Sequence, residues 1–240
     1  MTTTINLLSG PRNVSTALMY SFAQRPDTAV VDEPLYGHYL RHTRAPQPHC
    51  EELIEILETD GAKIVRDIIL SPPPGKPVYF IKNMAHHLVN LDDSFLEKVT
   101  NVFLIRDPVQ MLPSLIHQID SPTPRDAAYE SQANAFQRLK AAGQSPVVID
   151  SRELLLDPEG VLRELCLRTG IPFFPGMLAW EAGPRPEDGA WARWWYHNVH
   201  ASTGFQPFKE KSEPFPERMR PLLEECLPHY EALREEAVRP

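Results

Sequence analysis

Hydrophobic positions along this chain fall into two alternating kinds of segment. Short, continuous apolar runs rich in β-branched and aromatic residues predict strands that are covered on both faces of a sheet. These runs lie at residues 5–8, 29–31, 78–81, 102–105 and 147–149. Segments with the apolar spacing of helices lie between and beyond them, at residues 14–22, 50–58, 92–98, 108–118, 126–142, 158–169 and 215–237.

This alternation predicts an α/β fold of three layers, in which a central, mostly parallel sheet is flanked by helices. Proline-rich stretches at residues 72–74, 122–124 and 172–186 are interpreted as loops, because no Gly/Ser-rich or charge-biased linker divides the chain. We expect a single domain over residues 1–240, with the C-terminal segment 180–240 packed on the core as an extension that closes the site.

Composition and charge narrow the possible functions. With 240 residues and 42% hydrophobic content the chain can bury a core, which excludes disorder of the whole chain. The net charge of −8 argues against nucleic acid or an anionic membrane surface as a partner. An anionic ligand would therefore need a local cluster of cations.

Cysteine usage and the N-terminus bear on the compartment. Cys50, Cys166 and Cys226 are widely spaced and follow neither a disulfide framework nor a zinc-site pattern. The first residues contain no basic leader, and no apolar run approaches the length of a membrane span. We expect a cytoplasmic protein without membrane insertion and without a bound metal.

The first candidate site is the loop between the strand at residues 5–8 and the helix that follows. Free backbone N–H groups and the helix dipole converge at such a turn, which makes it suitable for a phosphate or sulfate group. The glycine permits the turn, the arginine can bind the anion's oxygens, and the hydroxyl groups can donate hydrogen bonds. We assign to this anion site Gly10, Arg12, Asn13, Ser15 and Thr16.

This loop differs from the phosphate loop of nucleotide hydrolases. Aligned on that motif, Val14 stands where the second glycine belongs and Ser15 where the lysine belongs. ATP chemistry is thereby disfavoured. An ordinary strand-to-helix turn with a Ser or Thr cap fits the same residues equally well.

The second candidate site follows the strand at residues 102–105. Arg106 ends that strand before Asp107 and Pro108, and Ser114 lies two helical turns further on. Both side chains can reach an anion beside the carboxyl edge of the sheet. Taken alone, Arg106 and Asp107 fit a structural ion pair better than a ligand site.

Together the two segments resemble the sulfotransferases that use 3′-phosphoadenosine-5′-phosphosulfate (PAPS). In that family a first strand–loop–helix holds the 5′-phosphosulfate, and a later Arg-Asp-Pro, with a serine eight residues after the arginine, holds the 3′-phosphate. Arg106 and Ser114 keep that spacing, and Arg12 matches the bacterial and sulfolipid-related branch, in which arginine replaces the usual lysine. The resemblance covers about residues 4–175. It implies a P-loop fold, PAPS as co-substrate, and transfer of its sulfuryl group to a hydroxyl or amine of a small acceptor.

Two further segments extend or weaken the resemblance. Residues 147–159 are similar to the family's strand and the Asp-Pro helix start that follows it. The Gly-rich, Lys-containing C-terminal segment of the cytosolic enzymes is matched only loosely, by residues 202–205 with Lys209 and Lys211.

Sulfuryl transfer is an in-line displacement that requires a base for the acceptor's proton and cations for the developing charge. Lys82 follows a predicted strand and can stabilise the leaving oxygen, and His86 or His87 can act as the base. Glu33, at the end of another strand, is the rival base. The histidines also fit a surface pair at a helix N-terminus, and Glu33 also fits a structural carboxylate that pairs with an arginine.

Other interpretations remain open at this point. A nucleoside or nucleotide kinase shares the strand–loop–helix and the parallel sheet, but it requires a lysine in the first loop. A non-catalytic nucleotide-binding relic would keep the arginines without needing Lys82, His86 or Glu33. The aromatic run at residues 191–196 could line a pocket, although this spacing is more often core packing.

Overall fold

The computed structural model describes residues 2–45, 47, 49–210 and 213–239. Its centre is a five-stranded sheet with the order β2-β3-β1-β4-β5, in which every neighbouring pair is parallel. The strands are β1 (Thr3–Ser9), β2 (Thr28–Asp32), β3 (Val78–Met84), β4 (Thr100–Ile105) and β5 (Val147–Asp150). The predicted α/β class is confirmed, and each strand extends beyond its apolar run into polar residues that pattern alone does not assign.

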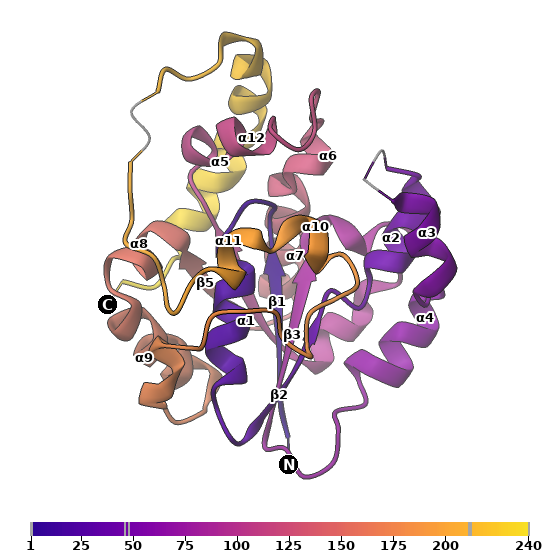
Figure 1. Ribbon diagram of the computed structural model, residues 1–240, viewed down its shortest axis with the longest axis vertical. Coiled ribbons are helices and arrows are strands. Elements are labelled where there is room, and N and C mark those ends of the chain that lie inside the picture. Colours follow the sequence, from indigo (N-terminus) through magenta and orange to yellow (C-terminus); the bar gives the residue numbers. More distant parts are fainter. Residues whose placement is uncertain (1, 46, 48, 211–212, 240) are drawn as a thin grey trace.

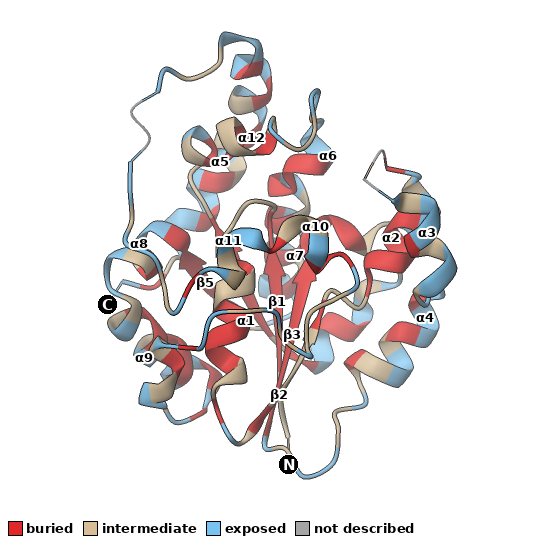
Figure 2. Cartoon of the chain, in the orientation of Figure 1, coloured by how far each residue is buried: buried red, intermediate tan, exposed pale blue. Residues whose placement is uncertain are grey.

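Alternation along the strands builds two cores, one on each face of the sheet. In β4, Val102 and Leu104 belong to one hydrophobic cluster, whereas Phe103 and Ile105 belong to the other. Figure 2 shows the strands buried between the two layers of helices. One layer contains α1 (Ser15–Ala23), α8 (Ser151–Leu156) and α9 (Pro158–Thr169); the other contains α5 (Pro108–Leu115), α7 (Tyr129–Ala141) and α12 (Arg220–Glu235).

Helix starts are set by local hydrogen bonds of the kind that the sequence signals. The Asp107 carboxylate accepts from the Val109 N–H at 2.8 Å, and a proline in the first turn completes the start of α5. Asp157 accepts from the Gly160 N–H at 2.9 Å in the same way at α9. Because an N-cap acceptor satisfies a free backbone donor and proline has none to lose, both helices begin where the Asp-Pro pairs stand.

Several short helices beside the β2 edge and near the chain's end were not predicted. Helix α2 and its neighbours lie to the right of the sheet in Figure 1, and α10 and α11 lie across the carboxyl ends of the central strands. These segments are α2 (Tyr36–Thr43), α4 (Gly61–Ile64), the π-helix η1 (Val65–Ile69), α10 (Ala192–Trp195) and α11 (His197–His200). The helix predicted at 126–142 is divided into α6 (Pro124–Ala127) and α7. α3 (Cys50–Ile56) was predicted, and the expected helix at 92–98 is a 3-10 helix, η3 (Asp93–Lys98). Further 3-10 helices are η2 (Ala85–Leu88), η4 (Pro175–Leu178) and η5 (Glu217–Met219).

The strand order creates a crevice at the carboxyl edge of the sheet. β1 and β4 are neighbours, but β1 leads into α1 on one face and β4 leads into α5 on the other. Chain segments that leave adjacent strands toward opposite faces leave a gap between them, and open α/β sheets bind ligands there. The two predicted anion loops are those that follow β1 and β4.

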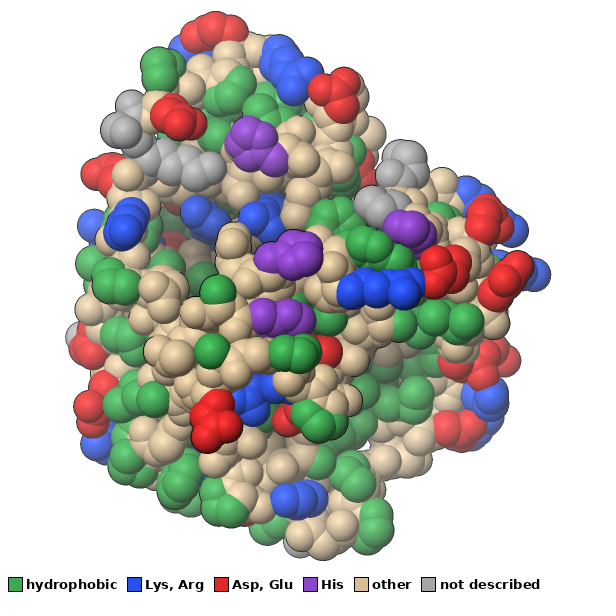
Figure 3. Space-filling view, in the orientation of Figure 1, with side chains coloured by type: hydrophobic (Ala, Val, Ile, Leu, Met, Phe, Trp, Pro, Cys, Tyr) green, Lys and Arg blue, Asp and Glu red, His purple; other side chains and the backbone are tan. Residues whose placement is uncertain are grey.

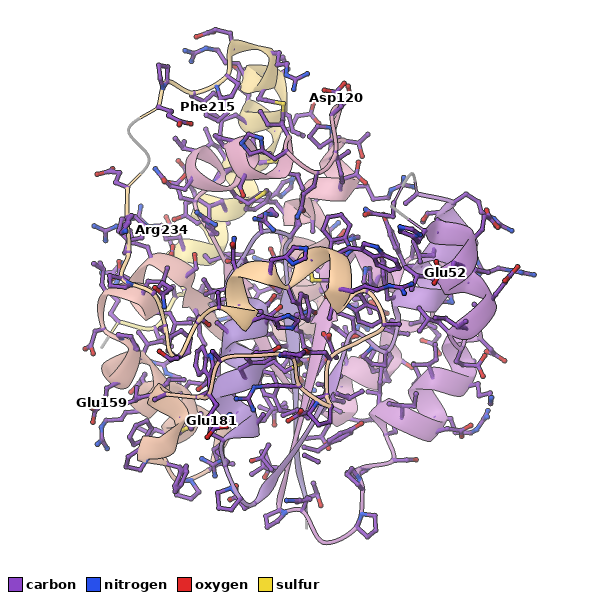
Figure 4. The ribbon with its side chains drawn as sticks, viewed as in Figure 1. Glu52, Asp120, Glu159, Glu181, Phe215 and Arg234 are labelled. Atoms are coloured by element: carbon purple, nitrogen blue, oxygen red, sulfur yellow. The ribbon has the colours of Figure 1, made fainter. Side chains whose placement is uncertain are left out.

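The C-terminal segment packs against elements far from it in sequence. Glu52 on α3, labelled in Figure 4, forms an ion pair with Arg193 of α10. Asp120, labelled at the upper end of the same view, pairs with Arg218 at 3.2 Å. In the part of the chain that the structure describes, no helix is both long and apolar enough to cross a membrane.

Candidate active site

One cavity, of about 440 Å³, lies at the carboxyl ends of the strands. This volume is in the range of small-molecule sites. Its wall combines the loop after β1, the ends of β2, β3 and β4, and the C-terminal segment; charged and polar members include Arg12, Asn13, Ser15, Thr16, Glu33, Lys82, His86, His87 and Arg106. Figure 3 shows Lys and Arg side chains beside a hollow on the face in view. The cavity thus joins most of the residues that the sequence assigned to two different tasks.

Two arginines from the two separate predicted anion loops meet in this cavity. Arg12 Nε donates to Ser114 Oγ at 2.9 Å, and Arg106 Nη1 donates to the Arg12 carbonyl oxygen at 2.6 Å. Among the described residues neither guanidinium group has a carboxylate within ion-pair distance. Burial lowers the pKa of both groups, because the charged form loses solvation. An anion between them would compensate charge that the protein itself leaves unpaired.

The backbone of the loop after β1 also offers free N–H donors at the cavity wall. Helix α1 begins without a side-chain cap, so the N–H groups of its first turn stay available at the cavity wall. Asn13 Nδ2 donates to the Leu104 carbonyl oxygen at 2.9 Å and ties the loop to β4. The left-handed residue of the turn is Arg12, at φ 51°, rather than Gly10. A Cβ on Gly10 would make only ordinary contacts at 3.5 Å, so the turn does not depend on glycine there.

Two buried side chains of α7 hold the two predicted anion loops in place and were missed by sequence analysis. Gln132 Nε2 donates to the carbonyl oxygens of Leu8 at 3.0 Å and Leu104 at 2.9 Å, which joins the ends of β1 and β4. Tyr129 donates from its hydroxyl to the Arg106 carbonyl oxygen at 2.7 Å. A polar residue on the apolar face of a predicted helix is the one signal that could have indicated Gln132.

Lys82 lies in a second cluster of the same cavity, and it is not a free cation. Register places it beside Asp32 on the neighbouring strand. Its ammonium group donates to Asp32 Oδ1 at 2.9 Å, to Glu33 Oε1, and to the Tyr196 hydroxyl at 2.8 Å. Burial opposes the charged form, but the charges of Asp32 and Glu33 outweigh it and raise the pKa of Lys82. The predicted contact of Lys82 with a leaving oxygen would have to compete with three protein partners.

Glu33 lines the cavity, and no described residue donates a hydrogen bond to its Oε2. Its backbone adopts φ 38°, and its N–H donates to the Lys82 carbonyl oxygen at 2.7 Å. Oε2 lies 4.0 Å from His87 Nδ1, and the side chain is 12% exposed. Burial raises the pKa of Glu33 and Lys82 opposes this effect; the net direction is upward. A carboxylate with a raised pKa is suited to take a proton near neutral pH.

Both histidines are buried, so their interpretation as a surface pair is wrong. His86 is 9% exposed and His87 is 1% exposed, and their rings pack on each other and on Tyr39. Nδ1 of each ring has no hydrogen-bond partner among the described residues. Burial lowers the pKa of His86 to about 4 and that of His87 well below its usual value. Both rings are therefore neutral and weakly basic at neutral pH.

The aromatic run of the C-terminal segment serves the cavity and the core together. Trp191 and Tyr196 are buried in a cluster with α2 and also line the cavity. Trp194 stacks on His49 instead, with ring centroids 4.0 Å apart. Lys209 lines the cavity, whereas Lys211 lies outside the described residues. No cluster of three or more His, Cys, Asp or Glu side chains that could hold a metal occurs within the described ranges.

Fold and cavity define a class: an α/β protein with a parallel sheet, in which the loop after β1 and a cluster of Lys82 with two carboxylates lie at the carboxyl ends of the strands. The model of the sulfotransferase domain matches residues 3–237. The chain therefore belongs to the sulfotransferase domain family, and the resemblance inferred from Arg12, Arg106 and Ser114 is confirmed at the level of the family.

The chain is also similar in sequence to known proteins. It is 43% identical over 232 residues to the branched-chain-amino-acid aminotransferase-like protein 2 of Arabidopsis thaliana. This match covers 96% of this chain and 41% of that protein. The chain thus spans about two fifths of the length of the curated relatives that it matches, at 41% of each.

Solved structures agree on the fold. The sulfotransferase domain of the olefin synthase of Synechococcus PCC 7002 has a TM-score of 0.54 at 16% identity, over 95% of this chain and 94% of that one. A sulfotransferase from Alicyclobacillus acidocaldarius also has a TM-score of 0.54, at 14% identity, over 99% and 98% of the two chains. At this identity the likeness shows a shared fold.

Proposed function

We propose that this chain transfers the sulfuryl group of PAPS to a hydroxyl or amine of a small acceptor. The observation that carries the proposal is the pair of half-buried guanidinium groups, Arg12 and Arg106, which share one cavity and have no carboxylate partner in the described chain. A ligand with two anionic ends suits such a pair, and PAPS has this chemistry. Ser15, Thr16 and the first turn of α1 would bind one end, and Arg106 with Ser114 the other.

Glu33 is the base that we propose for the acceptor. Its Oε2 would accept the acceptor's proton as the acceptor oxygen or nitrogen bonds to sulfur and the bond from sulfur to the phosphate oxygen breaks. Glu33 is preferred to His86, because burial raises the pKa of Glu33 toward neutrality and lowers that of His86 to about 4. His86 and His87 would then shape the pocket around the acceptor as neutral rings.

Nucleotide binding tests the donor. Isothermal calorimetry with adenosine 3′,5′-bisphosphate should show binding, and ATP with Mg²⁺ should bind at least about tenfold more weakly, because the first loop has Ser15 where a kinase needs lysine. Preference for ATP with Mg²⁺ would favour the kinase and overturn the proposal.

Turnover tests the base. A screen of alcohols, phenols, amines and sugars with radiolabelled PAPS identifies an acceptor, and Glu33→Gln and His86→Gln are then compared on it. Glu33→Gln should lower kcat about 10²-fold or more, in line with the loss of a general base, with nucleotide binding retained. Unchanged turnover in Glu33→Gln would transfer the role to another group. Unchanged turnover in both variants would favour a relic without this acid–base chemistry.

A further inference from the structure

One ammonium group is shared by two carboxylates in the wall of this cavity. Lys82 bonds to Asp32 and Glu33, and both Lys82 and Asp32 have side chains only 1% exposed. The three groups together carry one excess negative charge. An uncompensated charge in a buried site is costly, and proton uptake by one carboxylate is the simplest way to remove it.

The two carboxylates differ in how fully they are bonded. Asp32 Oδ1 accepts from Lys82, and Oδ2 accepts from the Tyr196 hydroxyl at 2.7 Å and from the Gly189 N–H at 3.1 Å. Among the described residues, the Glu33 carboxylate accepts a hydrogen bond from Lys82 alone, on Oε1, and its Oε2 lies 4.0 Å from His87 Nδ1. Hydrogen bonds to a carboxylate stabilise its ionised form, so Asp32 retains its charge and Glu33 is the carboxylate with the higher proton affinity.

The Tyr196 hydroxyl contributes to this difference in hydrogen bonding between Asp32 and Glu33. Its hydroxyl donates to Asp32 Oδ2 and accepts from Lys82 Nζ at 2.8 Å and from Trp191 Nε1 at 3.2 Å. Tyr196 and Gly189 both belong to the C-terminal segment, 164 and 157 residues from Asp32. The segment therefore completes the cluster around Lys82 as well as covering it.

We propose that Asp32 and Tyr196 are positioning residues that share the ammonium group of Lys82 with Glu33, so that Glu33 is only partly neutralised and stays able to accept a proton. The groups that face Glu33 are Asp32 from β2, Lys82 from β3, His87 from η2, Tyr36 from α2 and Tyr196 after α10. The use of that proton in catalysis rests on the proposed function, whereas the charge arrangement does not.

Infrared difference spectroscopy of the full chain tests the arrangement directly. The titration of Glu33 is isolated by subtracting spectra of Glu33→Gln from those of the unaltered protein across pH. Asp32→Asn removes the competing charge and leaves Glu33 as the carboxylate that neutralises Lys82. The pKa of Glu33 should then fall by about one unit or more, which moves its titration to lower pH. Tyr196→Phe should shift it in the same direction by less, because Lys82 loses one of its other two partners.

Tyr230→Phe is the matched control. Tyr230 is also a buried tyrosine that donates to a buried aspartate, Asp150, at 2.8 Å, but it does not contact Lys82. The Tyr230→Phe variant should leave the titration of Glu33 unchanged. If Asp32→Asn does not fold, as judged by circular dichroism, the shift of the Glu33 titration in Tyr196→Phe decides whether the proposal holds. A titration of Glu33 that does not move in the folded variants, or moves upward, overturns the proposal.

Calorimetry with adenosine 3′,5′-bisphosphate on the same proteins separates this inference from the proposed function. If Glu33 titrates as expected and the nucleotide does not bind, the charge arrangement stands and the assigned donor is wrong. If the nucleotide binds and Glu33 does not respond to Asp32→Asn, the positioning role is wrong and the assigned donor stands.

Discussion

At the residue scale, two side chains that we assign to chemistry stand on strained backbone. Arg12 and Glu33 both lie in the left-handed region, at φ 51° and 38°. Such conformations cost about 1–3 kcal/mol each in non-glycine residues and persist only where the surroundings impose them. Here Arg106 bonds to the Arg12 carbonyl oxygen, and the Glu33 N–H bonds to β3. Strain at these two positions agrees with their place in the candidate site.

Substitution of Arg106 should weaken nucleotide binding. Arg106→Lys keeps the charge but loses the planar set of donors, and charge-assisted hydrogen bonds contribute about 1.5–3 kcal/mol. Affinity for adenosine 3′,5′-bisphosphate should therefore fall about 10- to 100-fold in calorimetry. Arg168→Lys, on the exposed face of α9, is the control and should bind as before. Equal affinity in Arg106→Lys and even in Arg106→Ala would remove this residue from the donor site.

His86 should make stability depend on pH. Its pKa is lowered to about 4 by burial, so between pH about 6.5 and about 4 the unfolded chain binds a proton that folded His86 does not. The free energy of unfolding therefore falls as pH falls through this window, by roughly 3 kcal/mol for this group.

Urea unfolding at pH 7 and pH 4.5 measures the effect. His86→Gln should show a smaller loss between the two pH values than the unaltered protein, whatever its stability at pH 7. An equal loss in both proteins would mean that His86 titrates normally in the folded state.

At the scale of elements, helix α7 links the ends of the two strands that carry the arginine loops of the candidate site. Gln132 joins the carboxyl ends of β1 and β4, from which both arginine loops leave. The side chain is 1% exposed, so its loss would leave two buried carbonyl groups without this donor.

Gln132→Met should therefore destabilise the protein by about 1–3 kcal/mol in urea unfolding. It should also weaken binding of adenosine 3′,5′-bisphosphate, because the loops that hold Arg12 and Arg106 lose a shared support. Gln144→Met is the matched control, since Gln144 donates to the Glu97 carbonyl oxygen at an exposed position; it should change stability by less than about 0.5 kcal/mol. Similar stability of the two variants would contradict the bracing role.

At the scale of the whole molecule, the C-terminal segment is attached to the core at several separate points. Asp188 accepts from the Tyr20 hydroxyl of α1 at 2.7 Å and lies 2.9 Å from His200 Nε2. Tyr196 and Arg193 add contacts with β2–β3 and with α3. These contacts hold the C-terminal segment, which contributes Trp191 and Tyr196 to the cavity wall, against α1, α3 and the β2–β3 edge of the sheet. That residues 1–240 form a single domain stays a prediction.

Asp188→Asn should loosen this segment without loosening the sheet. It weakens the bond from Tyr20 and removes the charge that faces His200, so amide hydrogen exchange followed by mass spectrometry should become faster over residues 181–204. Peptides from β1 and β3 should exchange as before. Glu159→Gln, at an exposed position of α9 labelled in Figure 4, is the control and should change neither region. Faster exchange across the whole chain would mean that Asp188 supports global stability instead.

The sequence by itself determined the five strands, the α/β class, the family and the two arginine loops. Those properties are local: buried strands appear as continuous apolar runs, and the Arg-Asp-Pro and glycine-proline turns lie within a few residues of a strand end. Only the tertiary structure decided the partners of Lys82, the bracing by Gln132 and the burial of both histidines. Asp32 and Tyr196 are far apart in sequence and meet at Lys82 through strand register and through the docking of the C-terminal segment. A charged lysine in a fully buried strand requires a compensating partner such as a carboxylate. Which carboxylate pairs with Lys82, and in what geometry, depends on the strand order, which the pattern of apolar residues does not encode.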